Sequence, residues 1–549
     1  MEEKTCYVCK YTPTELLSAL GGNPLLLDRA PENFDLADQV AHPNLCGFGK
    51  AVIQAVMAGG VKELVLVNCC DTIRSVYDIL LEYGDLDFLY LMDLLHGSGG
   101  CSVDHARDQL LDLSEAYARY RGTRFDKNAF FASFRPSDPV SRPHIAVLGA
   151  HMGQELFDLT ARAMPLPAVN STCASNRSVE PPEDREDFVS LMTDYARSLL
   201  RQLPCMRMTD MTARRTLYNS PDLAGVVYHT VKFCDYYGFE YADLKERLPV
   251  SILKIESDGT RQSQEQLRTR LEAFAEGLAP QDKAPARKNA GGKGYFAGVD
   301  SGSTTTDVVI LDRDLAIVAK VILPTGAGAE KGAARALEEA LAQAGLSEDD
   351  LTATVTTGYG RSAIDLGEKS VTEITCHARG AHFLNPAVRT VIDIGGQDSK
   401  VIRLDETGGV VSFVMNDKCA AGTGRFLEMM ARTLELSLEE ISTIGLDWKE
   451  DIAISSMCTV FADSEVVSLV AKNKALPDIV HGLNNSVAAR AAALFRRVKG
   501  EPVCMMTGGV ARNQGVVQAI QEALGMDLYI HPDAQVCGAL GAALFALDL

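Results

Sequence analysis

The chain has 549 residues, more than one ordinary hydrophobic core holds, so several domains are expected. A formal net charge of −20 argues against nucleic acid or an anionic membrane as the main partner, because both bind basic patches. No apolar run approaches about 18 residues and no basic-then-apolar start is present, so we expect neither a membrane helix nor a signal peptide. These features predict a cytoplasmic protein, in which the 14 cysteines are packing residues or metal and cluster ligands rather than disulfides.

Residues 1–278 alternate strongly apolar strands with helices, as in "VKELVLVNCCDTIRSVYDIL" and "AGVVYHTVKFCDYYGFEYADLKE". Such strands are typical of a parallel, Rossmann-like sheet that is buried on both faces. Cys69 and Cys70 follow one of these strands, Cys234 follows another, and Cys46 lies in the loop "HPNLCGFGK". Because ligands gather at the carboxyl ends of parallel strands, these cysteines could converge. His151 also follows a strand, where a lone histidine is more often a hydrogen-bonded loop residue.

Residues 279–294 are rich in Ala, Pro, Gly and Lys and have no apolar period. This composition predicts a flexible linker between two domains, 1–278 and 295–549.

The C-terminal half contains two similar stretches, "GVDSGSTTTDVVILD" and "VIDIGGQDSKVIRLD". Each is an apolar strand, an Asp (Asp300 or Asp393), a Gly/Ser/Thr turn and a second strand, which indicates an internal duplication. Such turns offer backbone N–H groups and hydroxyls to phosphates, and the Asp can hold hydrated Mg²⁺ or orient water. The pattern is neither a Walker P-loop nor a Rossmann fingerprint.

Two cysteines of this half, Cys419 in "NDKCAAGTGRFLE" and Cys458 in "SSMCTVFADSEVV", each stand directly before a predicted helix. The positive end of a helix stabilises thiolates and anionic iron–sulfur clusters. One chain offers two such thiols, whereas a cubane takes four, so a two-fold dimer could complete the ligand set. Cys376, Cys504 and Cys537 lie in apolar settings and are expected to be packing residues.

The motifs "DSGSTTTD", "DIGGQDSK", "TGGVARN" and "GALGAAL" resemble those of the actin-like, sugar-kinase-like ATPase superfamily. With "NDKCAAGTGRF" and "CTVFADSEV", residues 295–549 look like the activators of 2-hydroxyacyl-CoA dehydratases and the ATPase subunits of benzoyl-CoA reductase. The resemblance implies a duplicated, ribonuclease H-like ATPase fold and a homodimer with one [4Fe-4S] cluster bound by Cys419 and Cys458. Asp300, Asp393 and Gln397 are the expected catalytic residues around ATP and Mg²⁺. The expected cofactor-binding residues are Gly302, Ser303, Thr304, Gly395 and Gly396 at the phosphates and Gly508 and Gly509 near adenosine.

The first half contains "CKYTPTELLSALGGNPLLL", "NLCGFGKAV" and "VNCCDTIRSVYDIL", which look like the dehydratase-subunit family of the same systems, including the double-cubane cluster proteins. The resemblance implies an iron–sulfur cluster bound by Cys46, Cys69 or Cys70, and Cys234, with Cys9 as the next candidate. Cys6, Cys101, Cys173 and Cys205 are either further ligands of a larger cluster or not ligands. The alternative interpretation is a domain that has the fold of this family but binds no cluster. The domain is also short for the family, which argues against an acyl-CoA pocket.

These resemblances imply ATP-dependent, low-potential electron transfer from the C-terminal cluster to a dehydratase-like acceptor, in the same chain or in another. A ferredoxin or flavodoxin is the expected donor. Two other classes of function are open: a small-molecule kinase of the same superfamily, which needs no iron, and a binding module that holds cluster and nucleotide without turnover.

Overall fold

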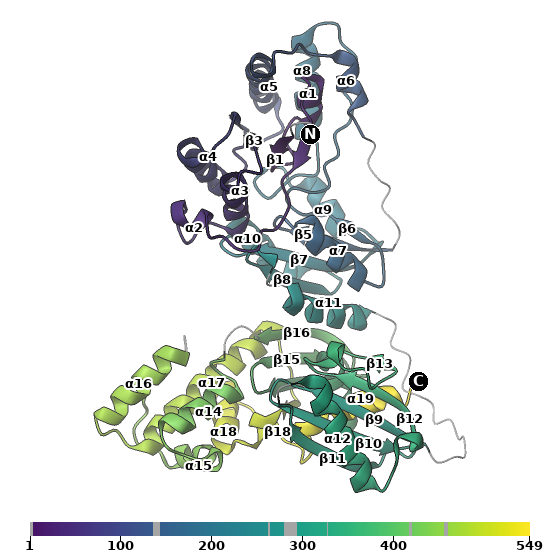
Figure 1. The fold of residues 1–549 in the computed structure, drawn as a ribbon, viewed down its shortest axis with the longest axis vertical. Helices are drawn as coiled ribbons and strands as arrows, with labels where there is room; N and C mark the ends of the chain where they lie inside the picture. The colour runs from purple at the N-terminus through teal and green to yellow at the C-terminus, as the bar shows by residue number, and fades with distance from the viewer. Residues whose placement is uncertain are drawn as a thin grey trace. The chain divides into compact units, whose positions relative to one another are not determined.

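The computed structural model of the chain describes residues 4–135, 143–261, 264–278, 294–326, 328–416, 420–454 and 459–549 (Figure 1). Contacts divide the chain into two units, Met1–Leu278 and Ala279–Leu549. Of the predicted linker, residues 279–293 lie outside the described residues. Within the described ranges, no helix is both long enough and apolar enough to cross a membrane.

The N-terminal unit contains two sheets in which every strand pair is parallel, as the apolar strands predicted. In the first sheet, Val65 and Val67 of the central strand point into one apolar core and Leu64 and Leu66 into the other, so both faces are covered. In order, this sheet consists of β2 (Pro24–Leu26), β1 (Thr5–Tyr7), β3 (Glu63–Val67) and β4 (Phe88–Met92). The second sheet consists of β6 (Ala168–Asn170), β5 (His144–Gly149), β7 (Leu223–Val231) and β8 (Ile252–Ser257).

Helices connect and cover these strands (Figure 1). Two helix pairs pack beside the first sheet, α3 with α4 and α5 with α8. Three other helices, α7, α10 and α11, pack against the second sheet. The helices of this unit are α1 (Thr14–Ala19), α2 (Ala37–Val40), α3 (Gly47–Met57), α4 (Asp71–Tyr83), α5 (Gly100–Arg121), α6 (Lys127–Ala132), α7 (Gln154–Ala163), α8 (Phe188–Leu200), α9 (Thr212–Tyr218), α10 (Asp235–Arg247) and α11 (Gln264–Leu278).

The C-terminal unit is built from two sheets of the same plan, each with three antiparallel strands followed by two parallel ones. The first consists of β11 (Ile317–Pro324), β10 (Thr305–Asp312), β9 (Tyr295–Ser301), β12 (Leu351–Thr357) and β13 (Lys369–Ser370). The second consists of β16 (Val410–Asn416), β15 (Ser399–Leu404), β14 (Thr390–Ile394), β17 (Cys504–Thr507) and β18 (Leu528–Tyr529).

Helices separate and flank these two sheets. The first sheet packs between α12 and α19, the second packs between α13 and α17, and α13 and α19 pack on each other in the middle. The unit is therefore layered helix, sheet, helix pair, sheet, helix. Its helices are α12 (Ala329–Ala344), α13 (Glu373–Leu384), α14 (Gly424–Thr433), α15 (Leu438–Thr443), α16 (Thr459–Ala471), α17 (Leu476–Val498), α18 (Gln514–Leu524) and α19 (Cys537–Ala546).

The strand register confirms the predicted duplication at the level of single residues. Asp300 of β9 lies opposite Asp307 of β10, and Asp393 of β14 lies opposite Lys400 of β15. On the other side, Thr357 pairs with Asp300 and Thr507 pairs with Asp393. The mixed α/β class and the duplicated, actin-like plan of the C-terminal half are thus as the sequence predicted.

Glycines allow the two central helices to cross with their backbones in contact. A Cβ atom on Gly541 of α19 would lie 1.9 Å from the carbonyl oxygen of Cys376 in α13, and one on Gly380 of α13 would lie 2.2 Å from that of Cys537. A side chain at either position would force the helices apart, and with them the two sheets that they support.

We expect Gly541→Ala to destabilise the C-terminal unit by about 2 kcal/mol, because a buried methyl group must displace backbone. Trp448, the single tryptophan of the chain, lies in this unit and stacks on His481 at 4.0 Å between ring centroids. Urea unfolding of the full chain followed by tryptophan fluorescence measures the effect. Gly328→Ala is the matched control, because a Cβ there meets nothing within 4 Å. Equal midpoints for both variants would contradict the close packing.

Candidate functional site

The two duplicated turns of the C-terminal unit face each other. A Cβ atom on Gly396 of the second turn would lie 2.1 Å from Thr304 Oγ1 of the first. Gly508 has a φ of +81°, and a Cβ atom there would lie 2.8 Å from Asp393 Oδ1. The structure therefore brings the predicted phosphate-binding residues of both turns and the Gly508 turn close to one another. Gln397 and Gly509 are solvent-exposed members of these turns.

A histidine that the sequence analysis did not identify lies between the two aspartates. His377 of α13 places Nε2 3.9 Å from Asp300 Oδ2 and Nδ1 3.7 Å from Asp393 Oδ1. The Thr507 hydroxyl donates to Asp393 Oδ1 at 2.9 Å. Glu373 lies one turn earlier on α13 and is also buried. The sequence carried one signal for this histidine: Glu373 and His377 are ionisable residues at positions i and i+4, on the same side of a helix.

Lys400 neutralises part of this carboxylate group. Its ammonium lies 2.9 Å from Asp398, 3.1 Å from Asp393 and 3.5 Å from Glu373, and it is buried. Burial alone would raise the pKa of Asp393, but His377 and Lys400 outweigh burial and lower this pKa to about 2. Asp393 is therefore held as a carboxylate at neutral pH.

The half of the site that contains the first turn is charged differently: Lys400 also lowers the pKa of Asp300, but burial and Asp307 outweigh it. Burial, reinforced by Asp307, raises the pKa of Asp300 to about 7, and burial raises the pKa of Asp307 to about 7. The buried atoms Ser301 Oγ, Thr304 Oγ1 and Asp307 Oδ1 have no hydrogen-bond partner among the described residues. This half thus holds unsatisfied hydroxyl and carboxylate groups.

These unsatisfied groups fit a Mg²⁺-bound nucleotide. Hydroxyl groups can donate to phosphate oxygens, and the carboxylates can hold hydrated Mg²⁺, which usually combines one or two carboxylates with phosphates and water. Within the described ranges, no three His, Cys, Asp or Glu side chains are arranged to hold a metal ion by themselves. The phosphates would therefore have to complete the coordination.

The N-terminal unit brings its predicted cysteines together at helix starts. Cys46, Cys70 and Cys234 are the N-cap residues of α3, α4 and α10. The neighbouring Cys69 thiol lowers the pKa of Cys9 and lowers the pKa of Cys70 to about 7, against the effect of burial. Cys234 lies within electrostatic range of Cys46 and Cys70. Burial outweighs the helix starts at Cys46, whose pKa it raises, and at Cys234, whose pKa it raises to about 12. Cluster binding would therefore have to displace these protons, and it is the gathering of several thiols at helix starts that fits an iron–sulfur cluster.

Two further cysteines belong to the same neighbourhood. Cys173 interacts electrostatically with Cys205, Cys9 and Cys234, and Cys205 interacts with Cys9. Lys10 is buried beside these cysteines. Burial lowers the pKa of Lys10, and Cys205, Cys173 and Cys9 partly offset this by raising it. Cys6 instead lies in the apolar core on β1, and Cys101 is exposed at the start of α5.

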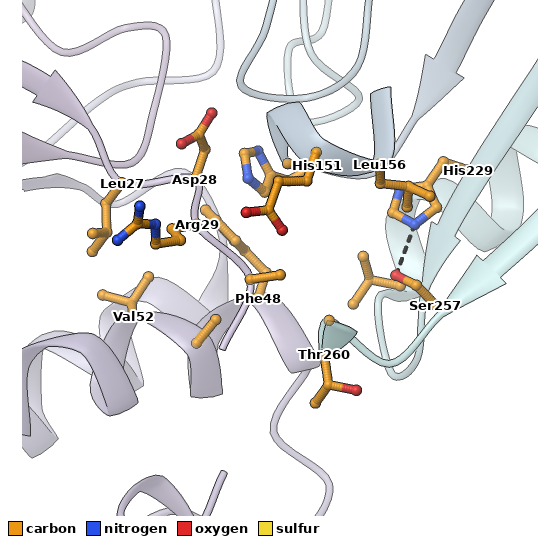
Figure 2. A pocket seen from close by; sticks show the side chains of 16 residues that line it. Leu27, Asp28, Arg29, Phe48, Val52, His151, Leu156, His229, Ser257 and Thr260 are labelled. Carbon is orange, nitrogen blue, oxygen red and sulfur yellow. Dashed lines mark hydrogen bonds between the residues drawn. The ribbon is translucent and has the colours of Figure 1, made fainter. Parts of the chain in front are cut away.

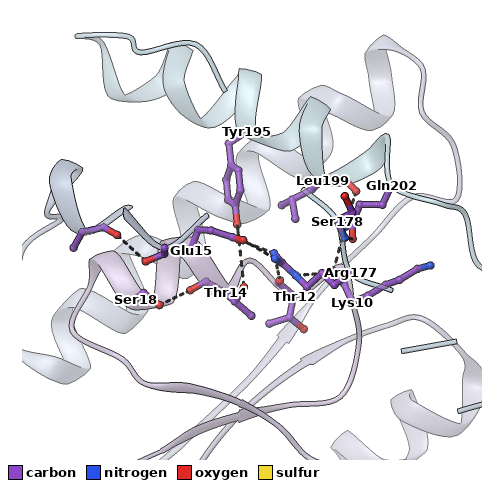
Figure 3. Close-up of polar contacts among 12 residues, drawn as sticks. Lys10, Thr12, Thr14, Glu15, Ser18, Arg177, Ser178, Tyr195, Leu199 and Gln202 are labelled. Atoms are coloured by element: carbon purple, nitrogen blue, oxygen red, sulfur yellow. Dashed lines mark hydrogen bonds and ion pairs between the residues drawn. The ribbon is translucent and has the colours of Figure 1, made fainter. Parts of the chain in front are cut away.

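Two buried ion pairs hold the cysteine-bearing segments in place. Arg177, which follows Cys173, binds both carboxylate oxygens of Glu15 at 2.5 and 2.6 Å and donates to the carbonyl oxygens of Lys10 and Thr12 (Figure 3). Arg214 binds Glu240 of α10 in the same bidentate way and donates to the carbonyl of Pro204. The Arg177–Glu15 pair therefore connects the segment that contains Cys9 with the segment that contains Cys173. The Arg214–Glu240 pair connects the segment that contains Cys205 with α10, which follows Cys234.

Cys419 and Cys458, the predicted ligands of the C-terminal cluster, lie outside the described residues. The helix α16 is described over Thr459–Ala471, and since residues 455–458 are not described, a helix start directly after Cys458 stays a prediction. The expectation for Cys419 was wrong in detail: α14 begins at Gly424, because a turn at 421–423 precedes it. Cys376, Cys504 and Cys537 are buried, as expected of packing residues.

The two halves match different family models. Residues 297–546 match the model described as "BadF/BadG/BcrA/BcrD ATPase family". Residues 9–139 and 132–278 match that of "2-hydroxyglutaryl-CoA dehydratase, D-component". The "Activator of lactoyl-CoA dehydratase" of Anaerotignum propionicum is 48% identical over 254 residues, which are 46% of this chain and 98% of the relative.

The chain belongs to the BadF/BadG/BcrA/BcrD ATPase family.

Other relatives of this ATPase family match the same half. The "(R)-2-hydroxyglutaryl-CoA dehydratase activating ATPase" of Acidaminococcus fermentans is 47% identical over 253 residues, 46% of this chain and 96% of the relative. A solved structure of the activator of the 2-hydroxyisocaproyl-CoA dehydratase from Clostridium difficile with bound ADPNP is 44% identical, with a TM-score of 0.45 over 46% of this chain and 94% of that one. The C-terminal half of this chain thus spans nearly the whole length of these relatives.

The pKa values near 7 predict how pH affects stability without nucleotide. The folded state keeps a proton on Asp307 up to about pH 7, whereas the unfolded chain releases it near its ordinary pKa of 3.8. The unfolded state therefore binds fewer protons in this window, and stability falls as pH rises from about 4 to 7. Asp307→Asn should flatten this fall. Urea midpoints by Trp448 fluorescence at several pH values measure it, with the exposed Asp314→Asn as control. A parallel pH dependence in all three proteins would contradict the assignment.

Proposed function

We propose that the chain is an ATP-hydrolysing iron–sulfur activase that couples nucleotide turnover in its C-terminal unit to low-potential electron delivery to a dehydratase-type acceptor. Cys419 and Cys458 of two chains would hold one [4Fe-4S] cluster in a homodimer, and the N-terminal cysteines would hold an acceptor cluster. A ferredoxin or flavodoxin would be the donor, and the acceptor would lie in the same chain or in a separate dehydratase. When bound, such clusters supply one-electron redox chemistry.

The observation that carries the proposal is a backbone link from the proposed nucleotide site toward Cys419. Gly424 N–H donates to the Gly395 carbonyl at 2.9 Å, and Arg425 N–H donates to that of Gly396 at 2.8 Å. The first turn of α14 is thus bonded to the second phosphate-binding turn. A phosphate that repositions this turn would also displace the start of α14, which lies shortly after Cys419.

A second contact extends this link to the other cysteine. The Thr433 hydroxyl at the end of α14 donates to Asp463 of α16 at 2.8 Å. Since Cys458 immediately precedes the described span of α16 in the sequence, and α14 follows Cys419, the two cysteines precede helices that contact each other. Nucleotide binding would therefore act on the two segments together.

The helix α16 also supports the homodimer. Phe461, Val467 and Val470 are 68%, 52% and 45% exposed in the single chain. A second copy of the chain would cover these apolar side chains and bring the second pair of thiols.

Around the nucleotide, different residues of the chain would bind the phosphates and the Mg²⁺ ion. The hydroxyls and backbone of the Gly302–Thr304 and Gly395–Gly396 turns would orient the phosphates, and Lys400 would keep Asp393 ionised. Asp300, Asp393 and Gln397 would hold Mg²⁺ and position the attacking water, with His377 fixing the two aspartates relative to each other.

Removing either thiol should remove the C-terminal cluster. A cubane shared by two chains contains about two irons per protomer. We therefore expect Cys419→Ala and Cys458→Ala, in the full chain purified without oxygen, each to lose about two irons per protomer, because two remaining thiols do not hold a cubane. Iron and sulfide assays with EPR measure this loss. The buried packing residue Cys504→Ala is the matched control. Unchanged iron in both variants would refute the redox function, and iron-free protein that consumes ATP only with an acceptor alcohol would favour the kinase.

Removing the Asp393 carboxylate should slow ATP hydrolysis without removing the iron–sulfur cluster. We expect Asp393→Asn to slow ATP hydrolysis by at least about 100-fold, because a preorganised charge at the phosphates is lost. Phosphate release measures the rate, and iron content and EPR should stay at the level of the unmodified chain. Asp405→Asn, in a partly exposed turn of the same unit, is the control. Hydrolysis at the original rate would exclude Asp393 from the ATP site.

A further inference from the structure

A cavity in the N-terminal unit is not used by the proposed function. It lies where β5, β7 and β8 end and along the first turns of α3 (Figure 2). Its empty space is about 660 Å³ when the open solvent at its mouth is included, of which about 50 Å³ is open to the centre of a water-sized sphere. Most of its lining is apolar, and its polar lining groups include two buried histidines and a serine. The residues that matter to the argument are Leu27, Phe48, Val52, His151, His229 and Ser257.

His151 offers an unused hydrogen-bonding atom to this cavity. Its side chain is buried, with 8% of the residue exposed, and its Nδ1 has no hydrogen-bond partner among the described residues. The ring packs on Phe48, with ring centroids 4.3 Å apart. Burial lowers the pKa of His151 to about 3, so the ring is neutral and carries one donor and one acceptor nitrogen. An unpaired buried nitrogen costs free energy unless a ligand pairs with it.

His229 and Ser257 form a second neutral group on the wall. His229 Nδ1 lies 3.3 Å from the Ala150 carbonyl, which can only accept, so Nδ1 carries the proton. Nε2 is then an acceptor, and the Ser257 hydroxyl donates to it at 2.9 Å. The lone pairs of Ser257 Oγ are left to accept a hydrogen bond. Burial lowers the pKa of His229 to about 4, so this pair also carries no charge at neutral pH.

The charges at the mouth do not favour an anionic ligand. Glu155 is paired with Arg261 at 2.6 and 3.0 Å, and Arg261 also binds Glu32 at 2.8 Å. Of the residues that line the cavity, Arg29 is the one lysine or arginine, and Asp28 stands next to it. A phosphate or a coenzyme A tail needs a cluster of basic groups, which this lining lacks.

We propose that this cavity binds a compact, uncharged organic molecule with an apolar body and one hydroxyl, carbonyl or amide group. The apolar body lies against Leu27, Phe48 and Val52, and the polar group pairs with His151 and Ser257. This assignment goes beyond the proposed function and requires neither nucleotide nor cluster. Because α3 begins at Cys46, the ligand lies along the helix that starts at a candidate cluster ligand.

Saturation-transfer NMR on the full chain tests the site with isobutyramide as the probe and isobutyrate as its charged counterpart. We expect saturation transfer to isobutyramide and at least fivefold less to isobutyrate. Ala51→Leu, which extends a half-buried lining residue of α3 into the cavity, should reduce the isobutyramide signal at least fivefold. Ala242→Leu on the exposed face of α10 is the matched control and should leave the signal unchanged.

His151→Phe separates the polar contact from the cavity itself. The variant keeps a ring against Phe48 but removes both nitrogens, so the isobutyramide signal should fall at least threefold while the thermal midpoint does not fall. No transfer to isobutyramide in the unmodified chain, equal transfer to isobutyrate, or equal signals from Ala51→Leu and Ala242→Leu would overturn the proposal. An unchanged signal in His151→Phe would remove His151 from it.

Discussion

The buried ionic network around Lys400 is the constraint on which the C-terminal unit depends. Lys400 binds Asp393, Asp398 and Glu373, and His377 lies between Asp393 and Asp300. A buried lysine without carboxylates, or buried carboxylates without a cation, would destabilise the fold by several kcal/mol. Because its members come from both duplicated halves and from α13, the network also sets the distance between the two phosphate-binding turns. Fold stability and the geometry of the proposed nucleotide site therefore rest on the same groups.

The network is asymmetric, and the asymmetry is chemically useful. Lys400 occupies in the second half the register position that Asp307 occupies in the first. The second half is thereby neutralised within the protein, whereas the first keeps carboxyl groups with pKa values near 7. A Mg²⁺-bound nucleotide would supply the missing positive charge on that side. The two duplicated halves therefore differ: the second contains Lys400 as its own cation, and in the proposed function the first would be completed by the nucleotide.

In the N-terminal unit, helix starts and arginine–carboxylate pairs position the cysteines. Three of them cap helices, so backbone N–H groups and helix dipoles face the thiols. The Arg177–Glu15 and Arg214–Glu240 pairs connect segments that are more than a hundred residues apart in one case and 26 in the other. Bidentate arginine–carboxylate pairs fix orientation as well as distance, which suits a ligand set drawn from separate loops.

The sequence by itself determined the α/β class, the duplication and the family, and it predicted a phosphate-binding role for the turns, because strand period, turn chemistry and motif order are local properties. It also pointed to Cys46, Cys69, Cys70 and Cys234, since strand ends and helix starts are visible in the pattern. Only the tertiary structure brought His377, Lys400 and Thr507 to the two aspartates, and Cys173 and Cys205 to Cys9. Sheet order and helix packing decide which distant residues meet, and a linear pattern contains no distances between them.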